Sequence, residues 1–528
     1  MKNTPESKGT WHHALVQTRR SQPSVSGTAI NAGDFIGHQP LLTATRLSFP
    51  VSRQEGAQQY AELKAAAHAA PTAHLTESGR EQLQADTGSL RAAVIFSTPR
   101  LPSDFAGLHV PVRLPADCSI AAGPSHLATM TSAAWAVFDK SGQQILSSDL
   151  HTWFAGVAAN LIILNPRIIY DQFCGRWLIV ACGRSRDGKS SRVLLSFSQT
   201  RNPTGAWWNW SLEAGTNGSE PSGLIADSLG VGLDNSALYL TANMFAADGC
   251  FHYAKLRIIN KSELMTGGAL VWRDCWDLRN PDDSPAFGLQ AAHTFGTPGI
   301  EYLLNATGAG RSLTHWRLTQ PLSDSPQLAL RTLPVASYQL APDASQPGSR
   351  TEIETGDTRL GNVIFRNGSL WAAHTVAANW DEPSNVSAIQ WFQINTGAGT
   401  VAQQHTYGHP SFYYFCPTMM VDGRGNLMMV FNRVSATEYP SIRFTGRLST
   451  DAVGQLHASV PLRESLVPAH AGWGSYNGAA IDTNDTKIWI IGQYPASEAE
   501  WGTWIGETSY MAGSSEGGVR TPRPALVS

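Results

Sequence analysis

The sequence predicts an all-β fold, a β-propeller of about seven four-stranded blades, and three observations lead to this prediction. The 528 residues are 42% hydrophobic and only 15% charged. They include 48 glycines and 17 tryptophans, a composition typical of short strands joined by tight turns. Segments of one kind, two apolar strands joined by a turn, recur roughly every 45–65 residues, which is the length of a propeller blade.

The repeated segments lie beyond Asp117. Six of them begin at Ala116, Pro166, Ala226, Thr358, Phe415 and Gly474, and a weaker seventh begins at Ala291. Turns such as DGRGN at 422–426 and RNGS at 366–369 have the composition of β-hairpins. We expect about seven blades, with six or eight as alternatives, and two unrelated β-sandwiches are the competing architecture.

The predicted propeller occupies residues 89–515 and lies between two segments of different character. Residues 1–88 are polar, and we expect them to be mostly disordered, with short helices near 54–70 and 78–86. Residues 516–528 are expected to form a disordered tail. The last strand, Gly502 to Glu507, is predicted to complete a blade that an N-terminal strand begins, for which Ala92–Ser97 is the candidate.

Charge and hydropathy exclude several classes of function. A formal net charge of −3 provides no basic field for nucleic acid. The chain has no apolar run long enough to span a membrane and no Sec signal peptide, so we expect a cytoplasmic protein or export by another route. Six scattered cysteines are expected to be reduced. No motif predicts a metal or cofactor, and we expect a monomer.

Four stretches carry a family resemblance: IAAGPSHL at 120–127, YDQFCGRW at 170–177, SQTRNPTGAWWNW at 198–210 and WGSYNGAAID at 473–482. With similar pieces over about 105–510, the chain resembles an uncharacterised family of bacterial β-propellers distantly related to the Asp-box, or sialidase-like, propellers. The resemblance implies the fold but no activity, because that family has no general assigned chemistry. The family tends to have Gly-Asp-Tyr-Ser where this chain has Gly474-Ser-Tyr-Asn477, so one inner carboxylate is missing.

Polar side chains stand where the innermost strands of different blades begin, and a propeller brings these positions together at one mouth of its channel. The candidate ligand-binding residues there are Asp117, Arg167, Asp227, Asp357, Arg359 and Asn477, with Asp171 after a first strand and His374 at the end of a second. Arginines with acids would suit a sugar or a peptide carboxylate. The alternative is structural, since aspartates at strand starts often accept backbone N–H bonds and tie blades together.

These features support two main functional hypotheses. The first is a non-catalytic scaffold that presents a channel mouth or loop surface, with Trp208 as an exposed aromatic, to a protein or glycan. The alternative is a carbohydrate-active enzyme, a glycoside hydrolase or lyase, in which Asp117, Asp227 and Asp357 supply paired carboxylates. A third hypothesis, a host-directed effector, has only the polar leader to support it.

Overall fold

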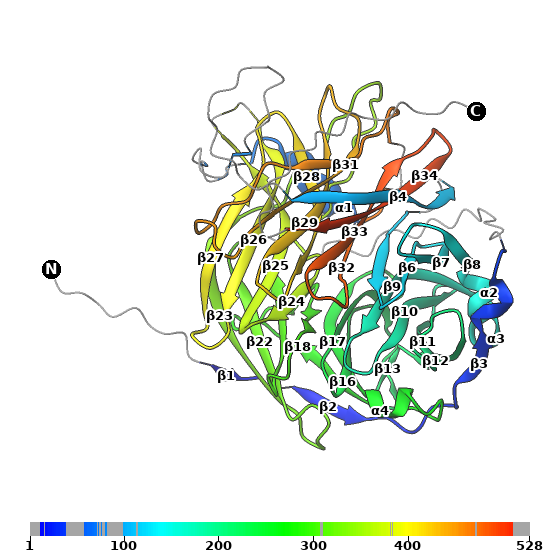
Figure 1. The fold of residues 1–528 in the computed structure, drawn as a ribbon. Helices are drawn as coiled ribbons and strands as arrows, with labels where there is room; N and C mark the ends of the chain where they lie inside the picture. Colours follow the sequence, from blue (N-terminus) through cyan, green and yellow to red (C-terminus); the bar gives the residue numbers. More distant parts are fainter. Residues whose placement is uncertain are drawn as a thin grey trace.

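The computed structural model describes residues 11–14, 16–38, 57–70, 72, 75, 80–81, 99–111, 115–306, 310–380, 382, 384–469 and 473–510. Within these residues the chain is mostly β-structure, arranged as sheets around a common centre (Figure 1). The helices there are short. They are α1 (Ala57–Ala67), α2 (Leu150–Trp153), α3 (Ala155–Ala158), α4 (Lys261–Leu264) and the 3₁₀ helix η1 (Ala32–Phe35).

Most strands are antiparallel neighbours in chain order, as the repeated hairpins predict. The first two sheets contain β5 (Ser119–Ala122), β6 (His126–Met130), β7 (Ala134–Asp139) and β8 (Gln144–Asp149), then β9 (Leu161–Asp171), β10 (Arg176–Ser185), β11 (Ser191–Ser198) and β12 (Ala206–Glu213). The next strands are β15 (Ile225–Leu233), β16 (Ala237–Phe245), β17 (Phe251–Asn260) and β18 (Trp272–Leu278), then β19 (Gln290–Ala291), β20 (His293–Thr294), β21 (Glu301–Ala306), β22 (Gly310–Thr319) and β23 (Gln327–Tyr338).

The remaining sheets continue the same order. They contain β24 (Val363–Arg366), β25 (Ser369–Ala378), β26 (Val386–Asn395) and β27 (Thr400–Tyr407), then β28 (Tyr413–Val421), β29 (Leu427–Val434), β30 (Ser441–Arg447) and β31 (Val460–Arg463), then β32 (Gly478–Ile481), β33 (Lys487–Pro495) and β34 (Glu500–Ser509). A small separate hairpin pairs β13 (Thr216–Asn217) with β14 (Glu220–Pro221).

The innermost strands form a closed ring, in which β15, β20 and β24 belong to one ten-stranded sheet. β5 contacts β9, β9 contacts β15, and the series continues through β20, β24 and β28 to β32, which contacts β5 again. A central channel bounded by inner strands, with sheets radiating outward, is the arrangement of a β-propeller. The core therefore lies between adjacent sheets. For example, Trp135, Trp153 and Trp207 pack edge to face with ring centroids 4.6–5.5 Å apart.

The last sheet is completed by an N-terminal strand, although not by the one the sequence suggested. β34 pairs along its length with β4 (Arg100–Pro111), with Ile505 opposite Phe105. Such a pairing removes the open edge between the first and last sheets. The candidate strand Ala92–Ser97 lies outside the described residues, as does most of the predicted helix at 78–86.

Residues 11–36 form a belt of added strands, contrary to the expectation of disorder. β1 (His12–His13) pairs with β23, β2 (Gln17–Arg20) with β18, and β3 (Thr28–Asn31) with β12. Figure 1 shows these strands in dark blue along the outer rim. The polar composition of this segment suggested disorder, and its side chains are indeed mostly exposed. Each strand is nevertheless ordered, because backbone hydrogen bonds hold it to the edge of a sheet and no buried side chains are needed.

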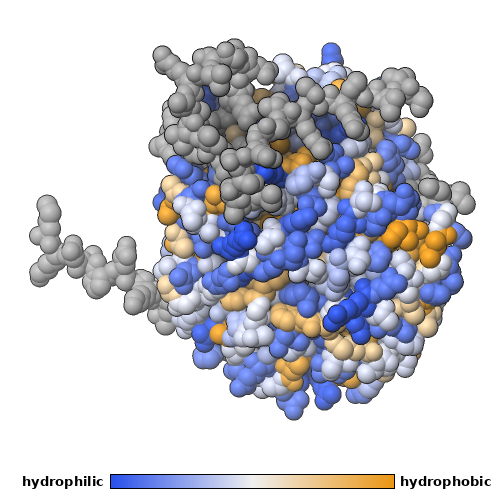
Figure 2. Space-filling view, viewed as in Figure 1, coloured by the Kyte–Doolittle hydropathy of each residue, from blue (hydrophilic) through white to orange (hydrophobic). Residues whose placement is uncertain are grey.

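The outer surface is mixed in character. On the face shown in Figure 2, hydrophilic residues predominate and apolar areas are interspersed among them. The large exposed hydrophobic residues, such as Val25, Val453 and Leu466, are scattered along the sequence. In the part of the chain that the structure describes, no helix is long and apolar enough to cross a membrane.

Candidate functional site at the channel mouth

Backbone irregularities mark one end of the inner strands. The pairing of β9, β15 and β28 each shifts register there, and the shifts fall at residues 165–166, 228–229 and 416–417. Asn165, Ser228 and Cys416 have φ values of 48°, 55° and 55°, and Asp117, before β5, has 44°. Bulges with left-handed non-glycine residues re-aim side chains and recur at functional sites. We call this end of the channel the mouth, formed by Asp117, Arg167, Asp227, Asp357, Arg359 and Tyr476.

Asp117 is the most deeply placed acid of the mouth. Its side chain is buried, and Oδ1 accepts a 2.6 Å hydrogen bond from the backbone N–H of Ser475, in the loop that leads into β32. Burial raises the pKa of this carboxyl and nearby Asp227 adds to the effect, whereas the Ser475 N–H and the charge of Arg167 oppose it. The net direction is upward, which favours the protonated acid.

Arg167 and Tyr476 form a stacked pair beside Asp117. The Arg167 guanidinium lies 3.6 Å from the centre of the Tyr476 ring. Arg167 comes from β9, whereas Tyr476 lies just before β32, so the pair bridges two sheets. A guanidinium stacked on an aromatic ring is fixed in orientation while its N–H groups stay available around its edge.

Asp357 and Arg359 form an ion pair on the loop that leads into β24. Arg359 Nε donates to the Asp357 carboxylate at 2.8 Å, and Nη1 donates to Ser228 Oγ at 2.9 Å. Ser228 follows Asp227, whose Oδ1 accepts the Ser228 N–H at 2.7 Å. These contacts join the β15 bulge to the β24 loop, and both acids thus lie on the same side of the mouth as Arg359.

Two adjoining cavities occupy the mouth and the channel behind it. The mouth cavity measures about 50 Å³ and is lined by Ser228, Asp357, Arg359, Cys416 and Tyr476, among others. The channel cavity measures about 120 Å³, and Arg167, Asn362, Thr418 and Asn477 contribute its polar lining. Tyr476 borders both cavities and so stands at the passage between them.

Asn477 and His374 have supporting positions. Asn477 is buried and donates to the Cys416 carbonyl at 2.8 Å and to Asn432 Oδ1 at 2.9 Å, so its amide ties neighbouring sheets together. His374 was predicted as a ligand-binding residue but is fully buried on β25. Its Nδ1 donates to the carbonyl of Thr358 at 2.9 Å, which fixes the backbone between Asp357 and Arg359. Burial lowers the pKa of His374.

Asp171 and Trp208 lie away from the mouth. Asp171 ends β9, four residues and about 13 Å along the strand from Arg167, and it is buried in a 2.6 Å ion pair with Lys261. Trp208 lies on the outer strand β12, half-buried opposite Ala29 of β3 and packed against Gly267. Alternation places Trp208 on the opposite face of β12 from the buried Trp207, and on the same face as the buried Trp210, against whose cluster it packs. The belt strand β3, which the sequence did not predict, pairs with β12 at this position.

Sequence reasoning missed Tyr476, Ser228 and the role of Ser475. The segment Trp473–Asp482 had been noted for its family resemblance, yet attention fell on the missing carboxylate rather than on the tyrosine. Ser228 carried no signal, because a bulge cannot be recognised from one polar residue. No group of three or more His, Cys, Asp or Glu side chains that could hold a metal ion occurs within the described ranges.

No protein-family model and no curated protein sequence matches the chain, whereas 220 chains among solved structures do. One is a Trypanosoma rangeli sialidase in complex with the inhibitor DANA, with 8% identity and a TM-score of 0.35 over 77% of this chain. The match spans 60% of that sialidase.

Two further matches cover nearly the whole of the other protein. The GH93 α-L-arabinofuranosidase of Fusarium graminearum in complex with arabinobiose has 8% identity and a TM-score of 0.35, over 76% of this chain and 97% of that one. The exo-β-1,3-galactanase of Phanerochaete chrysosporium with galactose has 10% identity and a TM-score of 0.29, over 74% and 96%. The prediction of a non-catalytic scaffold is contradicted here, because the similar structures are glycoside hydrolases, in line with the alternative hypothesis.

Proposed function

We propose that the chain is a carbohydrate-active enzyme that hydrolyses glycosidic bonds at the channel mouth. The observation that carries the proposal is the pair of carboxyl groups from two different sheets, Asp117 before β5 and Asp227 on β15, which interact electrostatically. Burial favours the protonated form of Asp117. Glycoside hydrolysis requires an acid that protonates the leaving oxygen and a second carboxyl group on the other side of the bond.

The roles we propose follow from these surroundings. Asp117 is the general acid, because its environment retains the proton that the leaving group needs. Asp227 is the second carboxyl group, acting as base or nucleophile. Arg359 lines the mouth cavity and Arg167 lines the channel cavity behind it, and their guanidinium groups would bind the hydroxyl or carboxylate groups of a sugar. Asp357 orients Arg359 through their ion pair.

We also propose that the propeller has seven four-stranded blades. Six consist of consecutive strands of their own, and the seventh combines β32, β33 and β34 with β4. The ten-stranded sheet counts as two blades, because β20 joins its halves by parallel pairing at one residue of β15 and two residues of β24. In this arrangement β1, β2 and β3 are fifth strands on three blades.

A panel of chromogenic glycosides tests the proposed activity. The full chain should release the aryl leaving group from at least one glycoside of a hexose, pentose or acidic sugar. Asp117→Asn and Asp227→Asn should each lower kcat by about 10³-fold, within the range expected for loss of an acid or base. Asp139→Asn is the matched control, because Asp139 is bonded within its own turn, through the N–H groups of Ser141 and Gln143.

The control variant should keep kcat within about twofold of the unmodified protein, since its turn does not reach the mouth. Circular dichroism would establish that all three variants are folded. Folded protein without turnover of any glycoside would refute the proposal. Undiminished turnover in the Asp117 and Asp227 variants would move the activity to another site.

A further inference from the structure

Helix α1 docks on the propeller through one narrow face. Tyr60, Lys64 and Ala67, spaced by four and three residues, are its buried positions, while Leu63 is 43% exposed. This spacing places the three residues on one side of a helix. The sequence predicted the helix from its alanine and glutamine content, but a face with a central lysine gave no sign that it would be buried.

Lys64 binds the loop that carries Asp357 and Arg359 of the mouth. Its ammonium group, 4% exposed, lies 2.8 Å from Asp343 Oδ1. It donates to the Ala341 carbonyl at 2.7 Å, to Thr355 Oγ1 at 2.8 Å and to the Gly356 carbonyl at 3.0 Å. Thr355 and Gly356 line the mouth cavity and directly precede Asp357. A buried ammonium needs such partners, so Lys64 holds this loop as long as the helix is docked.

Tyr60 brings the same helix to the edge of the proposed active site. Its side chain is 8% exposed, and its hydroxyl lies close enough to Arg359 to act on the charge of the guanidinium. Arg359 is thus ion-paired with Asp357 on its own loop and lies within electrostatic range of Tyr60 on the helix. The helix therefore contacts, through Lys64, the wall of the mouth cavity at Thr355 and Gly356, just before the pair of Asp357 and Arg359.

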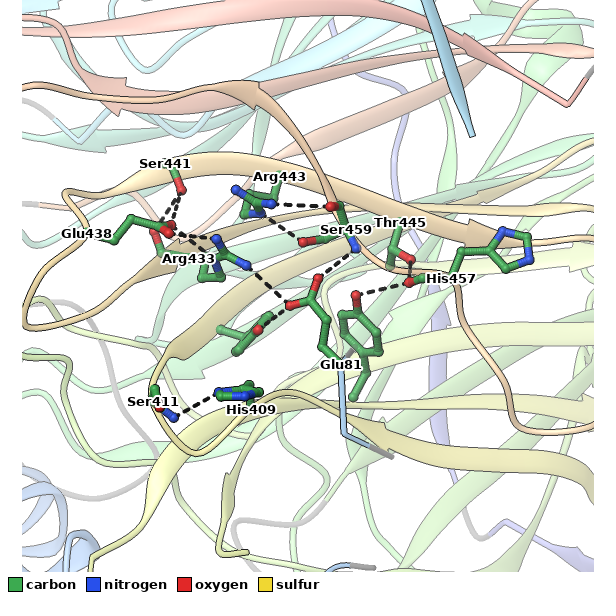
Figure 3. Close-up of polar contacts among 12 residues, drawn as sticks. Glu81, His409, Ser411, Arg433, Glu438, Ser441, Arg443, Thr445, His457 and Ser459 are labelled. Carbon is green, nitrogen blue, oxygen red and sulfur yellow. Dashed lines mark hydrogen bonds and ion pairs between the residues drawn. The ribbon is translucent and has the colours of Figure 1, made fainter. Parts of the chain in front are cut away.

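Two anchors hold the chain after α1. Asn385, before β26, donates to the carbonyls of Ala67 and Ala70 at 2.8 Å each. Farther on, the Glu81 carboxylate is buried in the β28–β31 sheet (Figure 3), where it accepts the Ser459 N–H at 2.7 Å and lies 3.3 Å from Arg433 Nη1. Arg433 and the hydrogen bonds from Ser459 and Tyr414 outweigh burial and lower the pKa of Glu81.

The mouth is too narrow for a sugar in this arrangement. Its cavity of about 50 Å³ is well below the roughly 300 Å³ at which ligand pockets begin. We propose that α1 is a cover that closes the channel mouth, and that a carbohydrate reaches Asp117 and Asp227 when the helix is displaced. This inference rests on the proposed function for its ligand, but the closure itself can be measured without any substrate.

Helix α1 is bound weakly enough to leave the propeller, and the chain on both sides of it is anchored, so that the helix can bind again. An isolated helix of 11 residues is marginal in water, and three buried side chains hold this one. The blades are held by continuous sheets, so α1 should open locally well before they do. The belt before it and the Glu81 anchor after it would keep the displaced helix at high effective concentration.

Thiol labelling of Cys416 in the full chain tests the cover. Cys416 lines the mouth cavity, and burial raises the pKa of its thiol, so its labelling is slow in the docked state. Lys64→Met should speed labelling of Cys416, resolved by peptide mass spectrometry, by about tenfold or more. Leu63→Ala, an exposed change on the same helix, should leave the rate unchanged. Cys182, buried between β10 and β15, reports whether the blades stay folded.

Each outcome decides the matter. Faster labelling of Cys416 with slow Cys182 supports the cover, and unchanged Cys416 labelling in folded Lys64→Met overturns it. If both thiols label faster, hydrogen exchange of the unmodified chain decides. Exchange of α1 amides about 100-fold faster than those of β29 supports local opening, and equal protection contradicts it. Faster labelling without turnover of any glycoside would refute the proposed function alone.

Discussion

The two ends of the inner strands use aspartate in different ways. At the hairpin end, where turns join β28 to β29 and β32 to β33, each aspartate accepts hydrogen bonds from its own hairpin, and Asp482 also pairs with Lys140 of a neighbouring sheet. Asp422 accepts the N–H groups of Arg424 and Asn426, and Asp482 accepts the indole N–H of Trp489. At the mouth, Asp117 is bound by Ser475, more than 350 residues away in the chain.

The difference has an electrostatic consequence. Lys140 and Trp489 outweigh burial and lower the pKa of Asp482, which stabilises its carboxylate. Burial without a bonded cation raises the pKa of Asp117. The hairpin end therefore uses charge to stabilise the fold, whereas the mouth keeps a carboxyl group in a setting that costs stability. Such a cost at one site is typical of a functional position.

The largest effect is expected where the mouth depends on close backbone approach. A Cβ on Gly474 would lie 2.6 Å from the backbone nitrogen of Asp117 and would overlap Gln493. Gly474→Ala should therefore lower the free energy of unfolding, measured in guanidinium chloride, by about 3 kcal/mol. Gly397→Ala, in the β26–β27 turn with no close neighbour, should change it by less than about 0.5 kcal/mol. Equal effects would mean that the mouth is not tightly built.

The next effect belongs to the hairpin end. Asp482→Ala leaves the buried Trp489 N–H and the Lys140 ammonium without their acceptor, so it should cost about 2 kcal/mol at pH 7. Because the folded pKa is lowered, the stabilisation is present above the unfolded pKa of about 3.9 and is lost as pH falls through the folded value. The difference in free energy of unfolding between the unmodified protein and Asp482→Ala should therefore narrow below about pH 4. Asp482→Asn should lower the free energy of unfolding by less than Asp482→Ala does.

Asp117→Asn should raise the free energy of unfolding at pH 7, the opposite of the effect expected for Asp482→Ala. Because the folded pKa is raised, the favourable contribution of Asp117 is complete below the unfolded pKa and is lost as pH rises through the folded value. An amide is neutral at every pH, so the free energy of unfolding of the variant should exceed that of the unmodified protein by on the order of 1 kcal/mol at pH 7. Near pH 3 the two proteins should be equally stable. Thermal unfolding at both pH values measures this. A loss at pH 7 would show that the Ser475 contact makes Asp117 a structural residue.

The smallest effect is expected at a hairpin turn that obeys only local rules. Asn367 has a φ of 50°, followed by Gly368 at 73°, as an Asn-Gly turn requires. Asn367→Gly suits the same backbone and should alter the free energy of unfolding by less than about 0.5 kcal/mol. A loss above 1 kcal/mol would show that the 3.3 Å bond from Asn367 to the Gly423 carbonyl of the next sheet contributes to stability, so that this turn does not obey local rules alone.

The same comparison explains what could be predicted from the sequence. The hairpins were recognisable because each is coded within a few residues, as in Asp422–Asn426. Arg167, Asp227 and Arg359 were proposed from the sequence because a repeat places equivalent positions at one mouth, and they stay candidates for a site. Ser228 and Tyr476 were not, because bulges and cross-blade stacking depend on partners far along the chain. The belt was missed because strands held by backbone bonds need no apolar pattern.

The belt strands can pair only after much of the chain has been synthesised. His12 pairs with Leu330, and Thr18 with Cys275, so the strands that leave the ribosome early have partners made 250 residues or more later. At about 5–20 residues per second, His12 would wait roughly a quarter of a minute to a minute for its partner. The earliest part of the belt to emerge is thus among the last to be placed. A nascent chain stopped before β23 should therefore carry His12 exposed to any chaperone or protease that meets it.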